Sequence, residues 1–386
     1  MKKVLSIAWN ELTNDNRVLN EAMSLKNNGY DVTIVGYKLD PKLSSREVWN
    51  GIKIKRINIA FKHLGFWQRI PYSRNIYLAI QLPIVFFWIA AGRFDFIHCH
   101  DLETLQYGFR IKLFKRNRVK LIYDAHEYET EISNLHGKAK VSAMKKERFL
   151  IKFCDRVITV GNTIAEEYVR LYGIEKPAVV LNCPILRSKE VVKKNLFREK
   201  FGIAASTKIL LYQGGMYHGR GIDIILETFD RFSFKDIVFI FLGEGEFTDK
   251  VKSHKKYGES VFHHPYVSGD VLLEYTSSAD IGVSFGEDIC LSHRYSLPNK
   301  MFEFIAAGIP VIGSAGLVEA KELLYKHGVG LATETDDVEG LAKVINNLPD
   351  LGSPELKDNL VKARAKFNWG TQEKVLLGLY EQLERP

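Results

Sequence analysis

The clearest chemical signal lies in residues 292–313, which read SHRYSLPNKMFEFIAAGIPVIG. The pattern predicts a loop up to Pro298, an amphipathic helix from Asn299 to Ala307, a stop at Gly308 and then a buried strand. The first N–H groups of such a helix have no partner within the helix, and that end carries partial positive charge. The segment therefore predicts a site for a phosphate group.

Two charged residues of this helix fall on one side of it. Lys300 and Glu303 are three residues apart, which brings their side chains together. A carboxylate beside a phosphate site could accept two hydrogen bonds from vicinal hydroxyls, such as those of a ribose. An ordinary surface helix with a Lys/Glu pair is the alternative interpretation.

Glycine-rich turns follow two predicted strands further upstream. The strand over 208–212 runs into the loop QGGMYHGRG, in which Gly214 and Gly215 let the backbone approach a ligand and Arg220 could bind a diphosphate bidentately. Gly243 and Glu244 close the next strand in the same manner. Each turn alone is a weak signal, but together with residues 292–313 they predict a single phosphate site.

The amino-terminal half has two strands that end in a histidine and an acidic residue. The strand over 94–98 leads into His100 and Asp101, and the strand over 119–123 leads into Asp124, His126 and Glu127. Ligands of an open parallel sheet bind beyond the carboxyl ends of its strands. We therefore expect these residues to form a site, although a lone histidine is more often structural.

The chain begins with a strand over 4–8, a helix capped by Asn14 or Asp15, and a strand over 32–35. This order predicts a right-handed βαβ unit and a parallel sheet. The spaced glycines of a dinucleotide fingerprint are missing from the first turn, which argues against bound NAD. Asp15 and Arg17 could line a cleft, and capping of the helix is an equally good explanation.

The length and the helix-strand pattern predict an α/β protein with two doubly wound halves. We expect an amino-terminal domain over 1–184, a second domain over 185–365, and a final helical segment over 366–386 that crosses back to the first domain. The linker is expected in the charged run that follows Pro184. The hydrophobic content of 46% and charged content of 26% are typical of a globular protein.

The charge is unevenly distributed. Residues 1–200 carry 35 basic and 20 acidic side chains, whereas residues 201–386 carry 19 and 26. In residues 62–74 cations alternate with aromatic residues, and the apolar run 76–91 follows. We expect contact with an anionic membrane surface rather than nucleic acid, with a buried helix and a solvated basic loop as the alternative.

The four cysteines are far apart and show no metal-ligand spacing, so we expect reduced thiols and no metal site. The apolar run behind Lys2 and Lys3 is too short for a signal-peptide core, and residues 76–91 are too short to span a bilayer. A cytoplasmic protein that can lie on the inner face of the plasma membrane is expected.

Several segments, in their order, resemble the family 4 retaining glycosyltransferases of the GT-B fold, particularly bacterial members that build surface polysaccharide. The resemblance runs through NDNRVLNEAMSLKNNGYDVTIVG, FIHCHDLETL, LIYDAHEYETE, ITVGNTIAEEY, LYQGGMYHGRGIDIILETF, FLGEGEF, ADIGVSF, SLPNKMFEFIAAGIPVIGS and NWGTQEKVLLGLY. It implies two Rossmann-like domains facing a central cleft. The carboxyl-terminal domain would hold a sugar nucleotide, and the amino-terminal domain would bind the acceptor. The residues expected on the acceptor side are Asp15, Arg17, His100, Asp101 and Glu127.

The resemblance assigns roles to individual residues. Arg220 matches the basic residue of the phosphate loop, and Glu303 matches the ribose-binding second Glu of the Glu-x7-Glu motif. The first Glu of that motif is replaced by Tyr295, and His126 matches a histidine beside the transferred hexose. The turn that replaces the first Glu consists of Ser296, Leu297, Pro298, Asn299 and Lys300. It would bring Asn299 and Lys300 near the diphosphate.

The implied reaction is transfer of a hexose from a nucleoside-diphosphate sugar, with a UDP-sugar favoured, to a glycan or lipid-linked glycan. The family generally needs no metal, so neither a cofactor nor a metal is expected. A sugar-nucleotide epimerase of the same fold and a non-catalytic sugar-binding protein are the alternatives.

Overall fold

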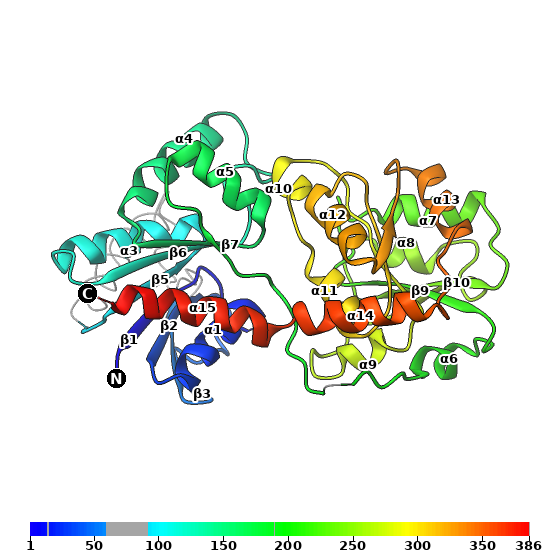
Figure 1. Ribbon diagram of the computed structural model, residues 1–386, viewed down its shortest axis with the longest axis horizontal. Coiled ribbons are helices and arrows are strands. Elements are labelled where there is room, and N and C mark those ends of the chain that lie inside the picture. Colours follow the sequence, from blue (N-terminus) through cyan, green and yellow to red (C-terminus); the bar gives the residue numbers. More distant parts are fainter. Residues whose placement is uncertain (14, 59–91, 189, 386) are drawn as a thin grey trace, which may run out of the picture. The chain divides into compact units, whose positions relative to one another are not determined.

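The computed structural model describes residues 1–385 apart from 14, 59–91 and 189 (Figure 1). The basic segment 62–74 and the apolar run 76–91 lie outside the described residues. Contacts divide the chain into two compact units, one of residues 1–130, 134–180 and 373–386 and one of residues 131–133 and 181–372. The domain boundaries predicted from the sequence were residues 184 and 365, compared with 180 and 372 in the structure. No helix in the described part of the chain is long and apolar enough to cross a bilayer.

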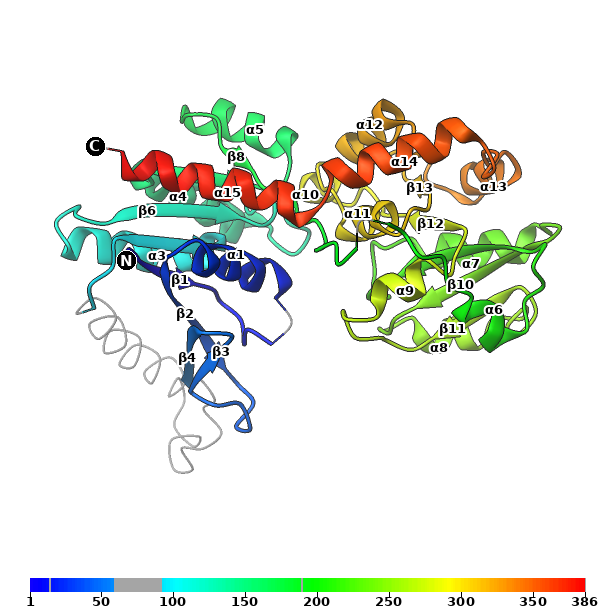
Figure 2. The ribbon, with the colours of Figure 1, turned by 60° about the horizontal axis from the view of Figure 1, so that its bottom comes forward.

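Among the described residues, the first unit contains an eight-stranded sheet with the order β3-β4-β2-β1-β5-β6-β7-β8, parallel except for the β3–β4 pair at one edge (Figure 2). Its elements are β1 Lys3–Ile7, α1 Asn16–Asn27, β2 Asp31–Lys38, β3 Arg46–Trp49, β4 Ile52–Asn58, β5 Phe96–His100, α3 Asp101–Phe114, β6 Lys120–Ala125, α4 Gly137–Leu150, a 3-10 turn Ile151–Phe153, β7 Arg156–Thr159, α5 Asn162–Tyr172, β8 Ala178–Val179 and most of α15 Trp369–Glu384.

Strand β5 has helices against both of its faces. Ile97 and Cys99 lie against Gly108 of α3, where an added Cβ would be 2.3 Å from the Cys99 sulfur. Phe96 and His98 point the other way and contact Tyr380 of α15, with ring centroids 5.0 and 6.2 Å apart. The alternation of a strand therefore places His98 and His100 on the α15 side of the sheet.

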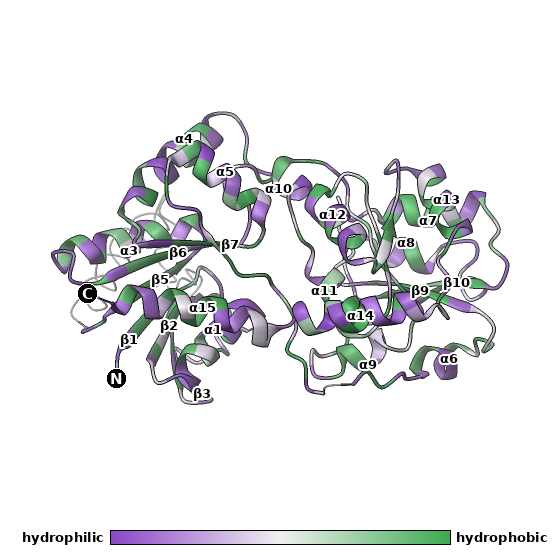
Figure 3. Cartoon of the chain, in the orientation of Figure 1, coloured by the Kyte–Doolittle hydropathy of each residue, from purple (hydrophilic) through white to green (hydrophobic). Residues whose placement is uncertain are grey.

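The second unit contains a parallel sheet whose six described strands have the order β11-β10-β9-β12-β13-β14. Its central strands, such as β10, are mainly hydrophobic, whereas its helices carry both kinds of residue (Figure 3). The elements are α6 Leu196–Phe201, β9 Lys208–Gln213, α7 Ile222–Arg231, β10 Ile237–Leu242, α8 Thr248–Lys252, β11 Val261–His264, α9 Leu272–Thr276, β12 Ile281–Ser284, α10 Leu291–Arg294, α11 Asn299–Ala306, β13 Val311–Gly313, α12 Val318–His327, β14 Gly330–Ala332, α13 Val338–Asn346 and α14 Pro354–Lys366.

The predicted helices and strands of both halves are largely confirmed, with three corrections. The loop predicted over 292–298 begins as α10, because the Cys290 sulfur accepts the His293 N–H at 3.4 Å and caps a short helix. The final helical segment predicted over 366–386 begins later, since α14 runs to Lys366 and α15 starts at Trp369. His100 and Asp124 lie inside β5 and β6 rather than after them.

Candidate functional site

The strand order of the second sheet changes direction between β9 and β12, the position at which ligands bind in such sheets. Strand β9 ends there in Gln213, which is 2% exposed. The Gln213 amide donates a hydrogen bond to Oε2 of Glu303, and its oxygen accepts one from Thr276 Oγ1 at 2.8 Å. These bonds hold the Glu303 carboxylate at the carboxyl end of β9.

Glu303 keeps hydrogen-bonding capacity for a ligand. Its side chain is half-buried, and no described residue donates a hydrogen bond to Oε1. Burial raises the pKa of this carboxyl, while the bond from Gln213 and the charge of Lys300 act in the opposite direction. Oε1 can therefore accept hydrogen bonds from hydroxyl groups.

Lys300 lies one turn before Glu303 and packs on an aromatic ring. Its Nζ is 3.9 Å from the centroid of the Tyr212 ring and forms no hydrogen bond or ion pair with the described residues. Burial and the charge of Arg220 lower the pKa of Lys300 to about 7, against the opposing effect of Glu303. The Tyr212 hydroxyl donates to the Gly215 carbonyl at 2.7 Å, which fixes the ring beneath the ammonium group.

Arg220 is the second cation of this site. Its side chain is exposed, and within the described part of the chain its guanidinium forms no hydrogen bond or ion pair. Because Arg220 depresses the Lys300 pKa, the two cations are close enough to repel each other. An anion bound between them would remove that repulsion, which makes this a site for a phosphate or diphosphate.

The glycine loops after β9 and β10 pack backbone against backbone. A Cβ at Gly243, where φ is +134°, would lie 2.2 Å from the Gly214 carbonyl oxygen, and one at Gly245 would lie 2.4 Å from that of Met216. Only glycine permits this approach. Gly214, Gly215 and Glu244 are exposed at the start of these loops.

The turn before α11 is held mainly by its own backbone. Ser296 Oγ donates to the His293 carbonyl at 2.8 Å, Leu297 is buried, and Pro298 precedes the helix without a side-chain cap. Asn299 is exposed at the first helical position. Tyr295, which stands in place of an expected Glu, is half-buried, and its N–H donates to the Leu291 carbonyl at 3.0 Å.

In the first unit, the His126 side chain is 19% exposed at the edge of a buried ionic network. Its Nε2 lies 3.0 Å from Asp124 Oδ2, and its Nδ1 lies 3.5 Å from Asp101 Oδ1. Burial acts to lower the His126 pKa, but the two carboxylates outweigh it and raise the pKa to about 9. At neutral pH His126 is therefore an imidazolium that can donate hydrogen bonds but cannot accept a proton.

Arg17 and His100 lie behind His126. The Arg17 guanidinium donates to both oxygens of Asp124, at 2.9 and 2.7 Å, and to the Val180 carbonyl at 2.7 Å. Burial acts to raise the Asp124 pKa, yet Arg17 and the neighbouring histidines hold it well below its usual range. Arg17 and His100 are only 3% and 1% exposed, so they orient Asp124 and His126 instead of lining the acceptor surface as predicted.

The other three residues predicted on the acceptor side lie before α1, at the start of α3 and next to His126. Asp15 caps α1, since its carboxylate accepts the Val18 N–H at 3.1 Å. Asp101 starts α3 with a left-handed φ of 64°, a strained conformation for this residue type, and accepts the His126 N–H at 3.3 Å. Glu127 is exposed next to His126 in the chain.

Each half of the chain matches a known sequence family. Residues 15–185 match the family described as Glycosyltransferase Family 4, and residues 207–350 match the one described as Glycosyl transferases group 1. The chain is a family 4 glycosyltransferase. An uncharacterized glycosyltransferase of Methanocaldococcus jannaschii is 25% identical over an alignment of 386 positions that covers 93% of this chain and 92% of that protein.

Solved structures show that this glycosyltransferase has the GT-B fold. Sucrose-phosphate synthase of Thermosynechococcus elongatus superimposes with a TM-score of 0.73 at 17% identity over 99% of both chains. HepE of Anabaena, solved in complex with UDP, superimposes with a TM-score of 0.71 at 14% identity over 99% of this chain and 100% of its own.

Sequence reasoning missed several residues that organise the glycosyltransferase site. Gln213 positions Glu303, and Tyr212 positions Lys300. The sequence did contain a signal for Gln213, because it is a polar residue at the end of a strand and directly before two glycines. His98 lies two residues before His100, so the strand period alone places it on the same face.

Proposed function

We propose that the protein is a retaining hexosyltransferase that transfers a hexose from a UDP-sugar to a glycan or lipid-linked glycan in polysaccharide synthesis. The main support is the pair of cations Arg220 and Lys300, which form no ion pair with any described residue, beside the Glu303 carboxylate. This arrangement matches the chemistry of a nucleoside diphosphate, with its anionic phosphates and vicinal ribose hydroxyls. The related HepE was solved with UDP-glucose, which favours UDP as the nucleotide.

In the proposed reaction the bond between the anomeric carbon and the diphosphate oxygen breaks, and negative charge develops on the leaving diphosphate. Arg220, Lys300 and the N–H groups at the start of α11 would stabilise that charge electrostatically. The acceptor hydroxyl forms the new bond on the same face of the sugar, and its proton passes to the departing phosphate. No protein base is required, which agrees with a protonated His126 acting only as a hydrogen-bond donor.

The experiment first screens nucleotide sugars by thermal shift and then follows the reaction of the selected donor with oligosaccharide acceptors by NMR. Retention predicts that the new linkage has the anomeric configuration of the donor. An inverted linkage would refute the mechanism. Release of an epimerised sugar from donor alone would identify an epimerase, and binding without any turnover would identify a sugar-binding protein.

We also propose that the first unit docks on anionic lipid through one face of α4. Lys138, Val141, Lys145 and Phe149 are exposed, and their spacing of three or four residues aligns them along the helix. Val141 and Phe149 are 51% and 54% exposed, and Phe149 packs edge-on against Phe109 of α3 at 5.6 Å. Cations interspersed with exposed apolar side chains suit the interface of an anionic membrane.

Co-sedimentation with vesicles tests this docking. Binding to anionic vesicles should exceed binding to neutral ones and fall with salt, because each basic residue at the surface contributes about 1 kcal/mol. Lys145→Gln should weaken binding at low salt and Phe149→Ser the part left at high salt. Val361→Ser changes a residue that is 67% exposed on α14 of the other unit and should have no effect. A parent protein that ignores anionic vesicles at low salt would exclude the docking.

A further inference from the structure

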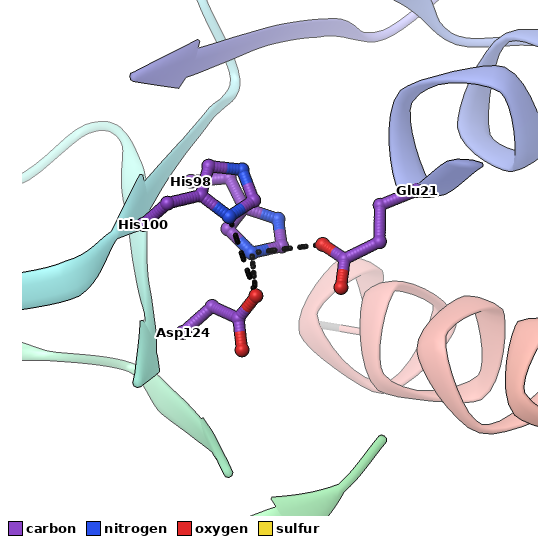
Figure 4. A group of neighbouring side chains, drawn as sticks. All are labelled: Glu21, His98, His100 and Asp124. Atoms are coloured by element: carbon purple, nitrogen blue, oxygen red, sulfur yellow. Dashed lines mark hydrogen bonds and ion pairs between the residues drawn. The ribbon is translucent and has the colours of Figure 1, made fainter. Parts of the chain in front are cut away.

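Four buried side chains of the first unit converge on one point deeper than His126 (Figure 4). Glu21 comes from α1, His98 and His100 from β5, and Asp124 from β6. One nitrogen or oxygen atom of each lies within 4.8 Å of those of the other three. The four residues are 1%, 1%, 1% and 0% exposed, so water does not reach the cluster from the surface.

The cluster contains polar atoms that form no hydrogen bond with any residue the structure describes. These are both carboxylate oxygens of Glu21 and Nε2 of His98. Arg17 Nε lies 3.2 Å from Glu21 Oε1 and compensates one oxygen by charge, while Oε2 faces His98 Nε2 at 3.4 Å. Buried polar atoms in native proteins nearly always have a partner. Their orientation toward one point indicates that the partner is a ligand bound there.

Two hydroxyl groups set how the histidines face this point. His98 Nδ1 lies 2.9 Å from the Tyr380 hydroxyl, and His100 Nε2 lies 2.9 Å from Ser6 Oγ. The second nitrogen of each ring faces the centre of the cluster, and His100 Nδ1 also lies 3.0 Å from His126 Nε2. Histidines that bind metals are held in this way, with the second nitrogen bonded to an outer partner.

We propose that Glu21, His98, His100 and Asp124 form a binding site for a divalent transition metal, with Zn²⁺ as the best fit. In tetrahedral zinc sites with bonds of about 2.0–2.1 Å, neighbouring ligand atoms are about 3.3–3.4 Å apart. His98 Nε2 is 3.4 Å from Glu21 Oε2 and 3.9 Å from Asp124 Oδ2, and His100 Nδ1 is 3.3 Å from Asp124 Oδ2. Two imidazoles with two carboxylates favour zinc over magnesium or calcium, which prefer oxygen ligands alone.

The site would have a structural role. Four protein ligands complete a tetrahedral shell and leave no open position for a substrate, and all four are buried. The metal would join α1, β5 and β6, with Arg17 as the outer partner of both carboxylates and Tyr380 linking α15 to the shell. This role is separate from sugar transfer, which the proposed mechanism carries out without a metal.

The test uses the full-length protein, stripped with a chelator and titrated with ZnCl₂. Bound zinc is measured by mass spectrometry after desalting, and Tm is measured with and without zinc. We expect one equivalent of zinc and a higher Tm in its presence. Substitution by Co²⁺ should give the visible absorption bands of a tetrahedral N/O site.

Glu21→Gln and His98→Gln retain side-chain volume and should each lower zinc affinity at least tenfold and abolish the rise in Tm. His136→Gln is the matched control, because His136 is exposed in the same unit. If the parent binds no stoichiometric zinc, the cluster is an ion-paired network only. If both variants bind zinc like the parent, the metal sits elsewhere. Either result overturns the proposal, and neither depends on the glycosyltransfer assay.

Discussion

Glu303 should contribute to donor affinity through the ribose hydroxyls, and this contribution can be measured against a matching change in the ligand. Gln213 occupies one lone pair of Oε2, which leaves Oε1 to accept from the donor. A hydrogen bond to a charged group contributes about 1.5–3 kcal/mol. Since 1.4 kcal/mol corresponds to a tenfold change in Kd, Glu303→Ala should weaken binding of UDP by about ten- to a hundredfold.

The decisive assay is a four-way comparison by isothermal titration calorimetry, with the parent and Glu303→Ala each titrated with UDP and with 2′-deoxy-UDP. The parent should lose about tenfold or more in affinity when the 2′-hydroxyl is removed. The variant should discriminate little between the two nucleotides, because it lacks the acceptor for that hydroxyl. Glu322→Ala, a change of an exposed residue on α12, serves as the control and should behave like the parent.

The ribose assignment is refuted if Glu303→Ala prefers UDP over 2′-deoxy-UDP by the same factor as the parent. In that case the carboxylate would act only by holding Gln213 and Lys300 in place. This outcome corresponds to an equal loss of affinity for both nucleotides, because an equal loss leaves the preference for UDP unchanged.

Three further outcomes follow from the charged groups. Arg220→Ala should lower kcat by about a hundredfold in steady-state assays. The control Arg231→Ala changes a residue at the far end of α7 and should match the parent. Equal losses of kcat in the two variants would exclude the phosphate-loop role of Arg220. Because Lys300 has a pKa of about 7 in the free enzyme and binds phosphate only when protonated, kcat/KM for the donor should fall as pH rises through about 7. In Arg220→Ala this decline of kcat/KM should move to higher pH, because the charge that lowers the Lys300 pKa is gone. A pH profile of kcat/KM that does not move would contradict the proximity of the two cations. Arg17→Met leaves Asp124 buried without its cation and should cost about 3–5 kcal/mol in denaturant unfolding, and a cost below about 1 kcal/mol would mean that the pair does not matter.

The sequence determined the features that depend on near neighbours. Short hydrophobic runs predicted most of the parallel strands of both units. Pro298 with the apolar spacing that follows it predicted α11 within one residue of its observed end. Ordered motifs identified the glycosyltransferase family and pointed to Arg220, Glu303 and His126. The short strands β11 and β14 were not predicted from the sequence.

Only the tertiary structure decided which side chains meet. Arg17 and Asp124 are 107 residues apart, and Gln213 and Glu303 are 90 apart, yet each pair is joined by hydrogen bonds. Strand order and register bring such residues together, and neither is written in the local pattern of any one segment. The same long-range packing buried Arg17, which the sequence predicted to line a cleft or to take part in capping the helix. Local periodicity reports which face of an element is apolar, whereas the partners across that face depend on how the whole sheet is wound.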